Sequence, residues 1–325
     1  MMFFFHIFAA SDEPFIHTHY SLFLYKGVPF ERIIAPLGQM CVTIFAFNTG
    51  YVMHKLPSMY IPFIKVMKRL AKFLISYWVV CVLFLIYGVA FNLQLPTFTA
   101  FLKNMFGFDV SVTQPYINVA HAWYVRYYIF ILLIAPLIIK LFSRTRWYID
   151  LSVLIMIMAL LPKGPTLILS IIWPIPSTLS GLFACKYKLL EVLHSVVSIK
   201  SQLYFPVLVD LFIIFMVLAC RHEFSGYNPW WRLDGLFVLL FIAAFTDLFN
   251  YISPIVLKIL RFIGSIGMYM WYLHSLYMVD INTWENILYY PGYPFLILTL
   301  GIIMMIPPAI FCKKVSDSIL SRILH

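Results

Sequence analysis

Two stretches of the chain, FAFNTGY (residues 45–51) and IKVMKRLAK (residues 64–72), decide the fold that we expect. The first stretch ends an apolar segment, and the second belongs to a basic turn that contains no acidic residue. The cations of this turn are Lys55, Lys65, Lys68, Arg69 and Lys72. A second apolar segment begins at Phe73. Two apolar segments joined by uncompensated cations predict a membrane hairpin whose turn faces the cytoplasm.

The composition indicates the same class of protein. Of the 325 residues, 63% are hydrophobic and only 11% are charged, whereas a soluble domain carries about 25% charged residues. Apolar runs of about twenty residues recur along the chain, which is the length that crosses a bilayer as a helix. We therefore expect an all-α, polytopic membrane protein that forms one domain over residues 1–325 without a soluble domain.

About ten transmembrane helices are expected, and the first of them is truncated. The run Met1–Ala10 spans about 15 Å as a helix, half of the roughly 30 Å hydrocarbon core. Either its beginning is missing, as a start codon placed too late would cause, or it enters the membrane without crossing. The other predicted spans are Ile33–Met53, Phe73–Asn92, His121–Leu141, Trp147–Leu161, Thr166–Cys185, Leu203–Cys220, Leu233–Ile252, Ile263–Val279 and Tyr293–Cys312.

The distribution of Lys and Arg gives the orientation. Counted on alternate sides of these spans, 16 cations fall on one side and six on the other, with Arg126 inside a span. This asymmetry predicts a multi-pass protein whose basic turn and C-terminus are cytoplasmic. The cations form no single patch, so no nucleic-acid partner is expected. The five cysteines show no paired spacing, which predicts neither disulfides nor a metal site.

Ionisable side chains inside apolar spans are costly and therefore informative. Here they are His6, Arg126, Asp210, Asp247 and His274. A neutral His6 suits a general base, although a histidine at the membrane interface is an alternative. Arg126 needs an acidic partner, for which Asp234 and Asp247 are candidates. His274 is either a helix-packing residue or a pocket residue.

Arg69 and Lys72 are three positions apart and so share one helical face. With the adjacent Lys68 they suit a clamp for phosphates, although ordinary cytoplasmic-loop cations would show the same pattern. A Gly-rich phosphate loop is absent, which excludes a Walker-type nucleotide site. Trp123 lies where an aromatic belt is expected.

Five short motifs occur in an order that resembles the acyltransferase-3 family of bacterial membrane O-acyltransferases. They are His6, Thr49-Gly50-Tyr51, Arg69-Leu70-Ala71-Lys72, Trp123-Tyr124 with Pro136, and Gly264-Ser265-Ile266-Gly267 with Trp271-Tyr272-Leu273-His274. The resemblance covers nearly the whole chain. It departs from the family pattern at Thr49, Lys72 and Gly267, where Ser, Arg and Ser are usual. The Arg that the family places eleven positions before its His would precede Met1, which puts activity in doubt if this N-terminus is genuine.

The resemblance implies an enzyme of the bacterial inner membrane, an acyltransferase that transfers groups other than aminoacyl groups. Its donor would be a cytoplasmic acyl-CoA, most simply acetyl-CoA, with no permanently bound cofactor. Its acceptor would be a sugar hydroxyl of a lipid-linked or surface glycan, as in O-acetylation during polysaccharide biosynthesis. In this reading His6 is the base, and Arg69, Lys72 and Lys68 bind CoA. The acceptor channel would contain Thr49, Tyr51, Trp123, Arg126 and His274.

Two alternatives stay open at this point. A secondary transporter of a lipid-linked sugar or small solute would use Asp210 and Asp247 as coupling sites, although the halves of the chain show no evident repeat. A truncated, non-catalytic relative would only bind the glycan or lipid.

Overall fold

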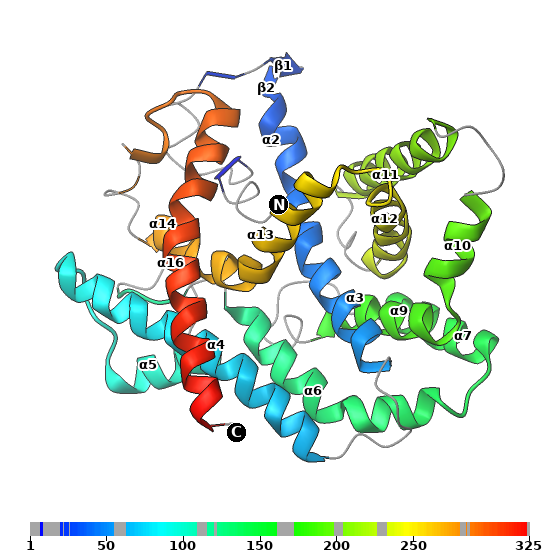
Figure 1. Cartoon of the computed structure of the whole chain (residues 1–325), viewed down its shortest axis with the longest axis horizontal. Coiled ribbons are helices and arrows are strands. Elements are labelled where there is room, and N and C mark those ends of the chain that lie inside the picture. The colour runs from blue at the N-terminus through cyan, green and yellow to red at the C-terminus, as the bar shows by residue number, and fades with distance from the viewer. Residues whose placement is uncertain are drawn as a thin grey trace. The chain divides into compact units, whose positions relative to one another are not determined.

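A computed structural model describes most of the chain, namely residues 7–8, 20–21, 23–25, 27–54, 63–108, 116–119, 122–160, 172–197, 204–225, 233–279, 284 and 287–323. Helices dominate this part (Figure 1). The helices are α2 (Phe30–Ile34), α3 (Met40–His54), α4 (Phe63–Ala90), α5 (Phe98–Met105), α6 (Trp123–Phe142), α7 (Trp147–Leu160), α9 (Ile175–Lys186), α10 (Leu189–Val197), α11 (Tyr204–Ser225), α12 (Asp234–Leu248), α13 (Pro254–Leu273), α14 (Ser275–Val279) and α16 (Pro294–Ile323). A 3-10 helix, η2 (Ala35–Gln39), joins α2 to α3. Strands β1 (Leu24–Tyr25) and β2 (Val28–Pro29) pair antiparallel.

Helices make up most of the described residues, which confirms the all-α part of the expectation, whereas the number of about ten transmembrane helices stays a prediction. Within the described residues, five helical segments are long and apolar enough to cross a bilayer. They are Phe30–His54, Phe63–Ala90, Trp123–Phe142, Pro254–Tyr277 and Pro294–Ile323. Two shorter apolar helices, Trp147–Leu160 and Pro206–Cys220, coincide with two other predicted spans.

Several helices extend beyond the predicted spans. Helix α4 begins at Phe63, directly after Pro62, so Lys65, Lys68, Arg69 and Lys72 lie in its first turns and not in a turn between helices. Proline is common at the start of helices. A helix can also include lysines near the membrane interface, because their long side chains extend toward water. Helix α13 likewise begins nine residues before the predicted Ile263.

The predicted loop over residues 93–120 contains a helix, α5, that the apolar pattern did not indicate. The side chain of Thr97 caps it by accepting a hydrogen bond from the Ala100 amide at 3.2 Å. Two bonds then hold α5 against α4, since the Tyr77 hydroxyl donates to the Asn104 carbonyl at 2.7 Å and the Trp78 indole N–H donates to the Met105 carbonyl at 2.9 Å. The predicted loop is therefore partly a packed helix.

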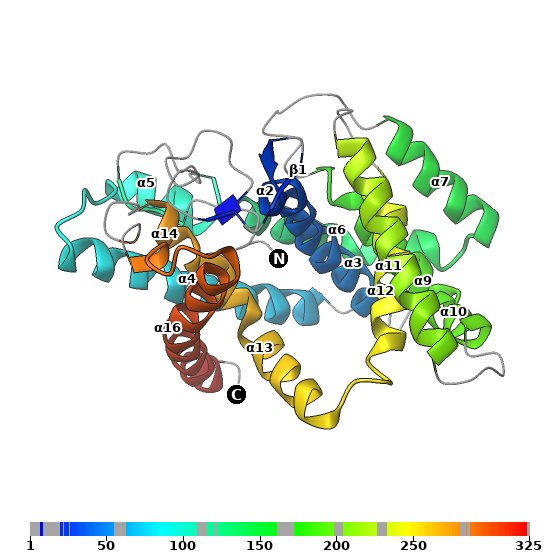
Figure 2. The ribbon, with the colours of Figure 1, turned by 90° about the horizontal axis from the view of Figure 1, so that it is seen from above.

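The chain divides into two compact units, each of which is described by itself. Unit 1 comprises residues 1–2, 36–61 and 133–258, and unit 2 comprises residues 3–35, 62–132 and 259–325. In unit 2, α16 packs across α4 (Figure 1). In unit 1, α11 and α12 lie side by side (Figure 2), and α3 packs closely on α9. The prediction of a single domain stays a prediction.

Two glycines permit the close contact between α3 and α9. A Cβ atom at Gly50 would lie 1.9 Å from the Thr178 carbonyl oxygen, and one at Gly181 would lie 2.0 Å from the Phe47 carbonyl oxygen. Both distances are far below van der Waals contact, so only glycine fits at either position. The Thr178 hydroxyl also donates to the Ala46 carbonyl at 3.0 Å. Small residues that let two helix backbones approach are typical of membrane helix interfaces.

Candidate functional site

The predicted site residues fall in both units. Unit 1 holds Thr49 and Tyr51 on α3, whereas unit 2 holds the cations of α4 together with Trp123, Arg126 and His274. His6, the predicted base, lies outside the described residues. The residues of each unit are therefore considered separately below.

The predicted phosphate clamp lies on the first turns of α4. Lys68 and Lys72 are exposed and Arg69 is half-buried. The positive charge of Arg69 is close enough to the Tyr128 hydroxyl of α6 to interact with it electrostatically. The Tyr128 ring also contacts the Phe73 ring, with centroids 4.1 Å apart. Among the ion pairs that the structure shows between described residues, none involves these three cations. Lys68 and Lys72 are thus at the surface of unit 2 on the same helix as Arg69.

Aromatic side chains join α4, α6 and α13 next to this basic face. Tyr77 of α4 packs on Tyr272 of α13 with ring centroids 4.9 Å apart. Tyr124, adjacent to Trp123 on α6, contacts Trp271 of α13 edge-on at 5.1 Å. A buried polar contact adds to this packing, since the Tyr269 hydroxyl donates to Ser76 at 3.1 Å. Three segments that carry predicted motifs therefore pack together within unit 2.

Arg126 lies one turn into α6 and is 7% exposed. Its guanidinium lies 5.7 Å from the centre of the Phe108 ring, a cation–π distance. The Nε and Nη1 atoms are buried and have no hydrogen-bond partner in the described structure. The ion pairs seen among the described residues do not include Arg126, and Asp247, one of its two candidate partners, contacts His194.

His274 occupies the break between α13 and α14 and is 1% exposed. Its Nδ1–H donates to the carbonyl oxygen of Trp271, three residues earlier. This bond orients the ring, and the choice between a packing role and a pocket role stays a prediction.

The FAFNTGY segment lies on α3 of unit 1, and its contacts are those of helix packing. The Thr49 hydroxyl donates to the Phe45 carbonyl at 2.8 Å, within the same helix. The Tyr51 ring stacks on Phe47 at 6.1 Å. Gly50, between them, lies at the α3–α9 contact. The structure thus provides a packing role for the glycine of this motif.

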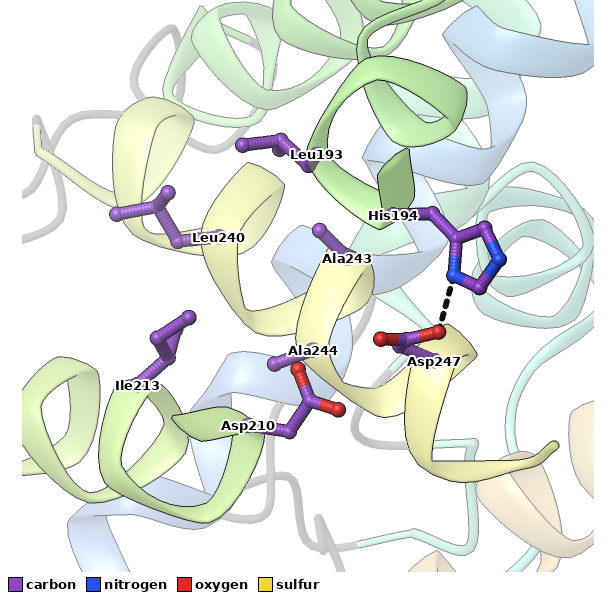
Figure 3. Close-up of a pocket in the computed structure, with 8 residues that line it drawn as sticks. All are labelled: Leu193, His194, Asp210, Ile213, Leu240, Ala243, Ala244 and Asp247. Carbon is purple, nitrogen blue, oxygen red and sulfur yellow. Dashed lines mark hydrogen bonds and ion pairs between the residues drawn. The ribbon is translucent and has the colours of Figure 1, made fainter. Parts of the chain in front are cut away.

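A pocket in unit 1 unites two acids that the sequence analysis singled out and one histidine that it missed (Figure 3). Asp210 of α11 and Asp247 of α12 are 1% and 4% exposed, and His194 of α10 is half-exposed. The His194 Nδ1 atom contacts Asp247 Oδ1, which also accepts a bond from the Asn250 amide at 3.2 Å. The pocket is small and partly open to the surface. Its remaining wall is apolar and consists of Leu193, Ile213, Leu240, Ala243 and Ala244.

Hydropathy gave no signal for His194, because this residue lies between two predicted spans. The structure shows a short helix, α10, where the sequence predicted a loop. A weak signal exists in hindsight, since Leu189, Val192 and Leu193 recur at helical spacing around it. The described residues contain no group of three or more His, Cys, Asp or Glu side chains placed to hold a metal ion.

Comparison of the chain with family models, with curated protein sequences and with solved structures finds no match.

Proposed function

We propose that this protein is a membrane O-acyltransferase of the bacterial inner membrane, with about ten spans and a cytoplasmic C-terminus. It would transfer an acyl group, most simply acetyl, from cytoplasmic acyl-CoA to a sugar hydroxyl of a lipid-linked or surface glycan. The observation that carries the proposal is the packing of α4, α6 and α13 in unit 2. These helices carry three of the motifs that resemble the acyltransferase-3 family, and they meet through Phe73–Tyr128, Tyr124–Trp271 and Tyr77–Tyr272.

The cations of α4 would bind the phosphates of CoA. Arg69 can donate two parallel hydrogen bonds to a phosphate, whereas Lys72 and Lys68 act as point charges. The exposure of Lys68 and Lys72 on α4 supports this role. Binding energy from the remote phosphates would hold the thioester in position for the reaction.

The reaction needs one base. His6 would accept the proton of the sugar hydroxyl while its oxygen attacks the thioester carbonyl. The carbon–sulfur bond then breaks, an ester forms, and His6 returns the proton to the CoA sulfur. No net proton is consumed, and no metal ion or additional cofactor takes part.

The test uses membranes that contain the full chain, supplied with radiolabelled acetyl-CoA. Charge-assisted hydrogen bonds contribute about 1.5–3 kcal/mol each, so Arg69→Ala should raise the KM for acetyl-CoA about 10- to 100-fold. Lys72→Ala should also raise the KM for acetyl-CoA. The matched control is Lys313→Ala on α16, because Lys313 is a half-exposed cation that pairs with Asp317 within the same helix. An unchanged KM in both α4 variants would refute the clamp, and full transfer by His6→Ala would refute the base.

A further inference from the structure

The pocket of unit 1 contains negative charge that its own side chains do not fully compensate. The Oδ2 atoms of Asp210 and of Asp247 are both buried and have no hydrogen-bond partner in the described structure. Figure 3 shows the two carboxyl groups next to each other at one end of the pocket. Burying even one ionised carboxylate without partners is strongly unfavourable. Asp247 has His194 and Asn250 as partners of its Oδ1 atom, but two ionised carboxylates in one pocket need more positive charge than one histidine can supply.

The position of Asp247 increases this requirement. It lies in the last turn of α12, where the negative end of the helix dipole disfavours a carboxylate. Asp210 and Asp247 line the same pocket and interact electrostatically. Two carboxylates in one site repel each other, and a single proton held by the pair removes this repulsion.

Among the described residues, three further polar groups face the pair. His194 on α10 contacts Asp247, and Asn250 and Tyr251 come from the turn after α12. Of these, only His194 can carry a positive charge. An imidazolium would compensate one of the two carboxylates and leave one negative charge in the pocket.

We propose that Asp210 and Asp247 together bind one exchangeable proton, and that His194 exchanges this proton with the surroundings of the pocket. In the uptake step the His194 imidazolium gives its Nδ1 proton to the carboxylate pair. The products are a neutral imidazole and a singly protonated pair, and the reverse step releases the proton. His194 suits the exchange because half of its side chain is exposed while its Nδ1 atom contacts Asp247.

This site is separate from the proposed acyl transfer, which consumes no net proton and is argued from the motifs on α4, α6 and α13. It also provides unit 1 with a chemistry of its own. Carboxyl groups within membrane helices that take up and release protons are the functional groups of proton-coupled pumps and transporters. A proton is favoured over a metal ion here because the described residues offer no set of three or more suitable ligands.

The first experiment uses the unaltered protein in lipid nanodiscs. A hydrophobic carbodiimide adds to protonated carboxyl groups, and mass spectrometry of the digested protein locates the adduct. We expect an adduct on Asp210 or Asp247 that decreases as the pH rises, and none on the exposed Asp317. Labelling of neither pocket acid, or labelling that is independent of pH, would overturn the proposal. Sodium that suppresses labelling at constant pH would also overturn it, because the ligand would then be a metal cation.

The second experiment compares variants by infrared difference spectroscopy between acidic and neutral pH. The wild type should show the band of one buried protonated carboxyl. Asp210→Asn should lose this band, because Asp247 alone is compensated by His194, whereas the control Asp317→Asn should retain it. His194→Gln should keep the band but shift its midpoint to higher pH, because the positive charge that favours the ionised pair is removed. If Asp210→Asn leaves the band unchanged, the proposal that the two carboxyl groups share a proton is refuted.

Discussion

Replacement of Lys186 by Met tests whether a buried ion pair holds two helices of unit 1 together. Lys186 is the last residue of α9, and Asp150 lies in the first turn of α7. The Lys186 Nζ atom lies 2.6 Å from Asp150 Oδ2, and the two side chains are 14% and 3% exposed. The same ammonium donates to the carbonyl oxygens of Phe142 and Thr145, at 2.5 and 2.8 Å. One lysine thus binds both the end of α6 and the start of α7.

The expected loss of folding free energy depends on the contacts that Asp150 keeps after the substitution. Asp150 would keep hydrogen bonds from the Tyr187 hydroxyl, at 2.8 Å, and from the Thr145 hydroxyl, but it would lose its only cation among the described residues. Removing one partner of a buried pair costs about 3–5 kcal/mol, because the other charge is left uncompensated. Lys186→Met should therefore destabilise the protein by about this amount.

The assay is reversible unfolding in mixed detergent micelles for a double-mutant cycle of Lys186→Met and Asp150→Asn. The double variant should be more stable than the sum of the single losses predicts, with a coupling of about 0.5–3 kcal/mol. Lys313→Met is the matched control, because its pair with Asp317 is exposed and lies within one helix. A cost below about 1 kcal/mol for Lys186→Met, as for a surface pair, would refute the reasoning.

The stability that this ion pair contributes should fall at high pH. Burial acts to lower the pKa of Lys186, but its hydrogen bonds to Asp150 and Tyr187 outweigh burial and raise the pKa above the ordinary 10.5. The stabilisation is thus complete below pH 10.5 and is lost as the pH rises through the higher value of the folded state. Between neutral pH and pH 10.5 the wild type should keep the whole difference from Lys186→Met, which the same unfolding assay measures.

Two further substitutions test the packing of each unit by thermal unfolding in detergent. In unit 1, Gly50→Ala should destabilise by at least about 1–3 kcal/mol, because the new Cβ would lie 1.9 Å from the Thr178 carbonyl oxygen. The control Gly264→Ala, whose Cβ would have nothing within 4 Å, should be neutral or stabilising, and equal effects at both sites would contradict the close helix contact. In unit 2, Tyr77→Phe should cost about 0.5–1.5 kcal/mol through the lost bond to Asn104; an unchanged melting temperature would show that this bond contributes nothing.

The sequence predicted the class of protein and most of its helices, because hydrophobicity is a local property. A run of apolar residues must be helical in a bilayer wherever its neighbours lie. The ends of the helices were less well predicted. Helix α4 includes Lys65 and Lys68 because long cationic side chains can reach water from a helix near the interface, and the capping bond of Thr97 on α5 has no hydropathy signature.

The candidate site shows the same division. Helical spacing was sufficient to place Arg69 and Lys72 on one face of α4, but only the packing of the helices relates that face to Tyr128 of α6. Arg126 was expected to pair with an acid, and the structure instead shows its guanidinium above the Phe108 ring. Which residue faces a buried charge depends on the rotation of each helix, which a single sequence does not specify.

By itself, then, the sequence determined that this chain is a helical membrane protein with a strong asymmetry of cations and a few costly polar residues inside its apolar runs. The tertiary structure decided which of those residues meet. His194 and Asp247 are 53 positions apart and Lys186 and Asp150 are 36 apart, yet each pair is in contact. The reason is physical: a buried charge must find compensation wherever the packed helices provide it, and that location is a property of the packing rather than of any local pattern.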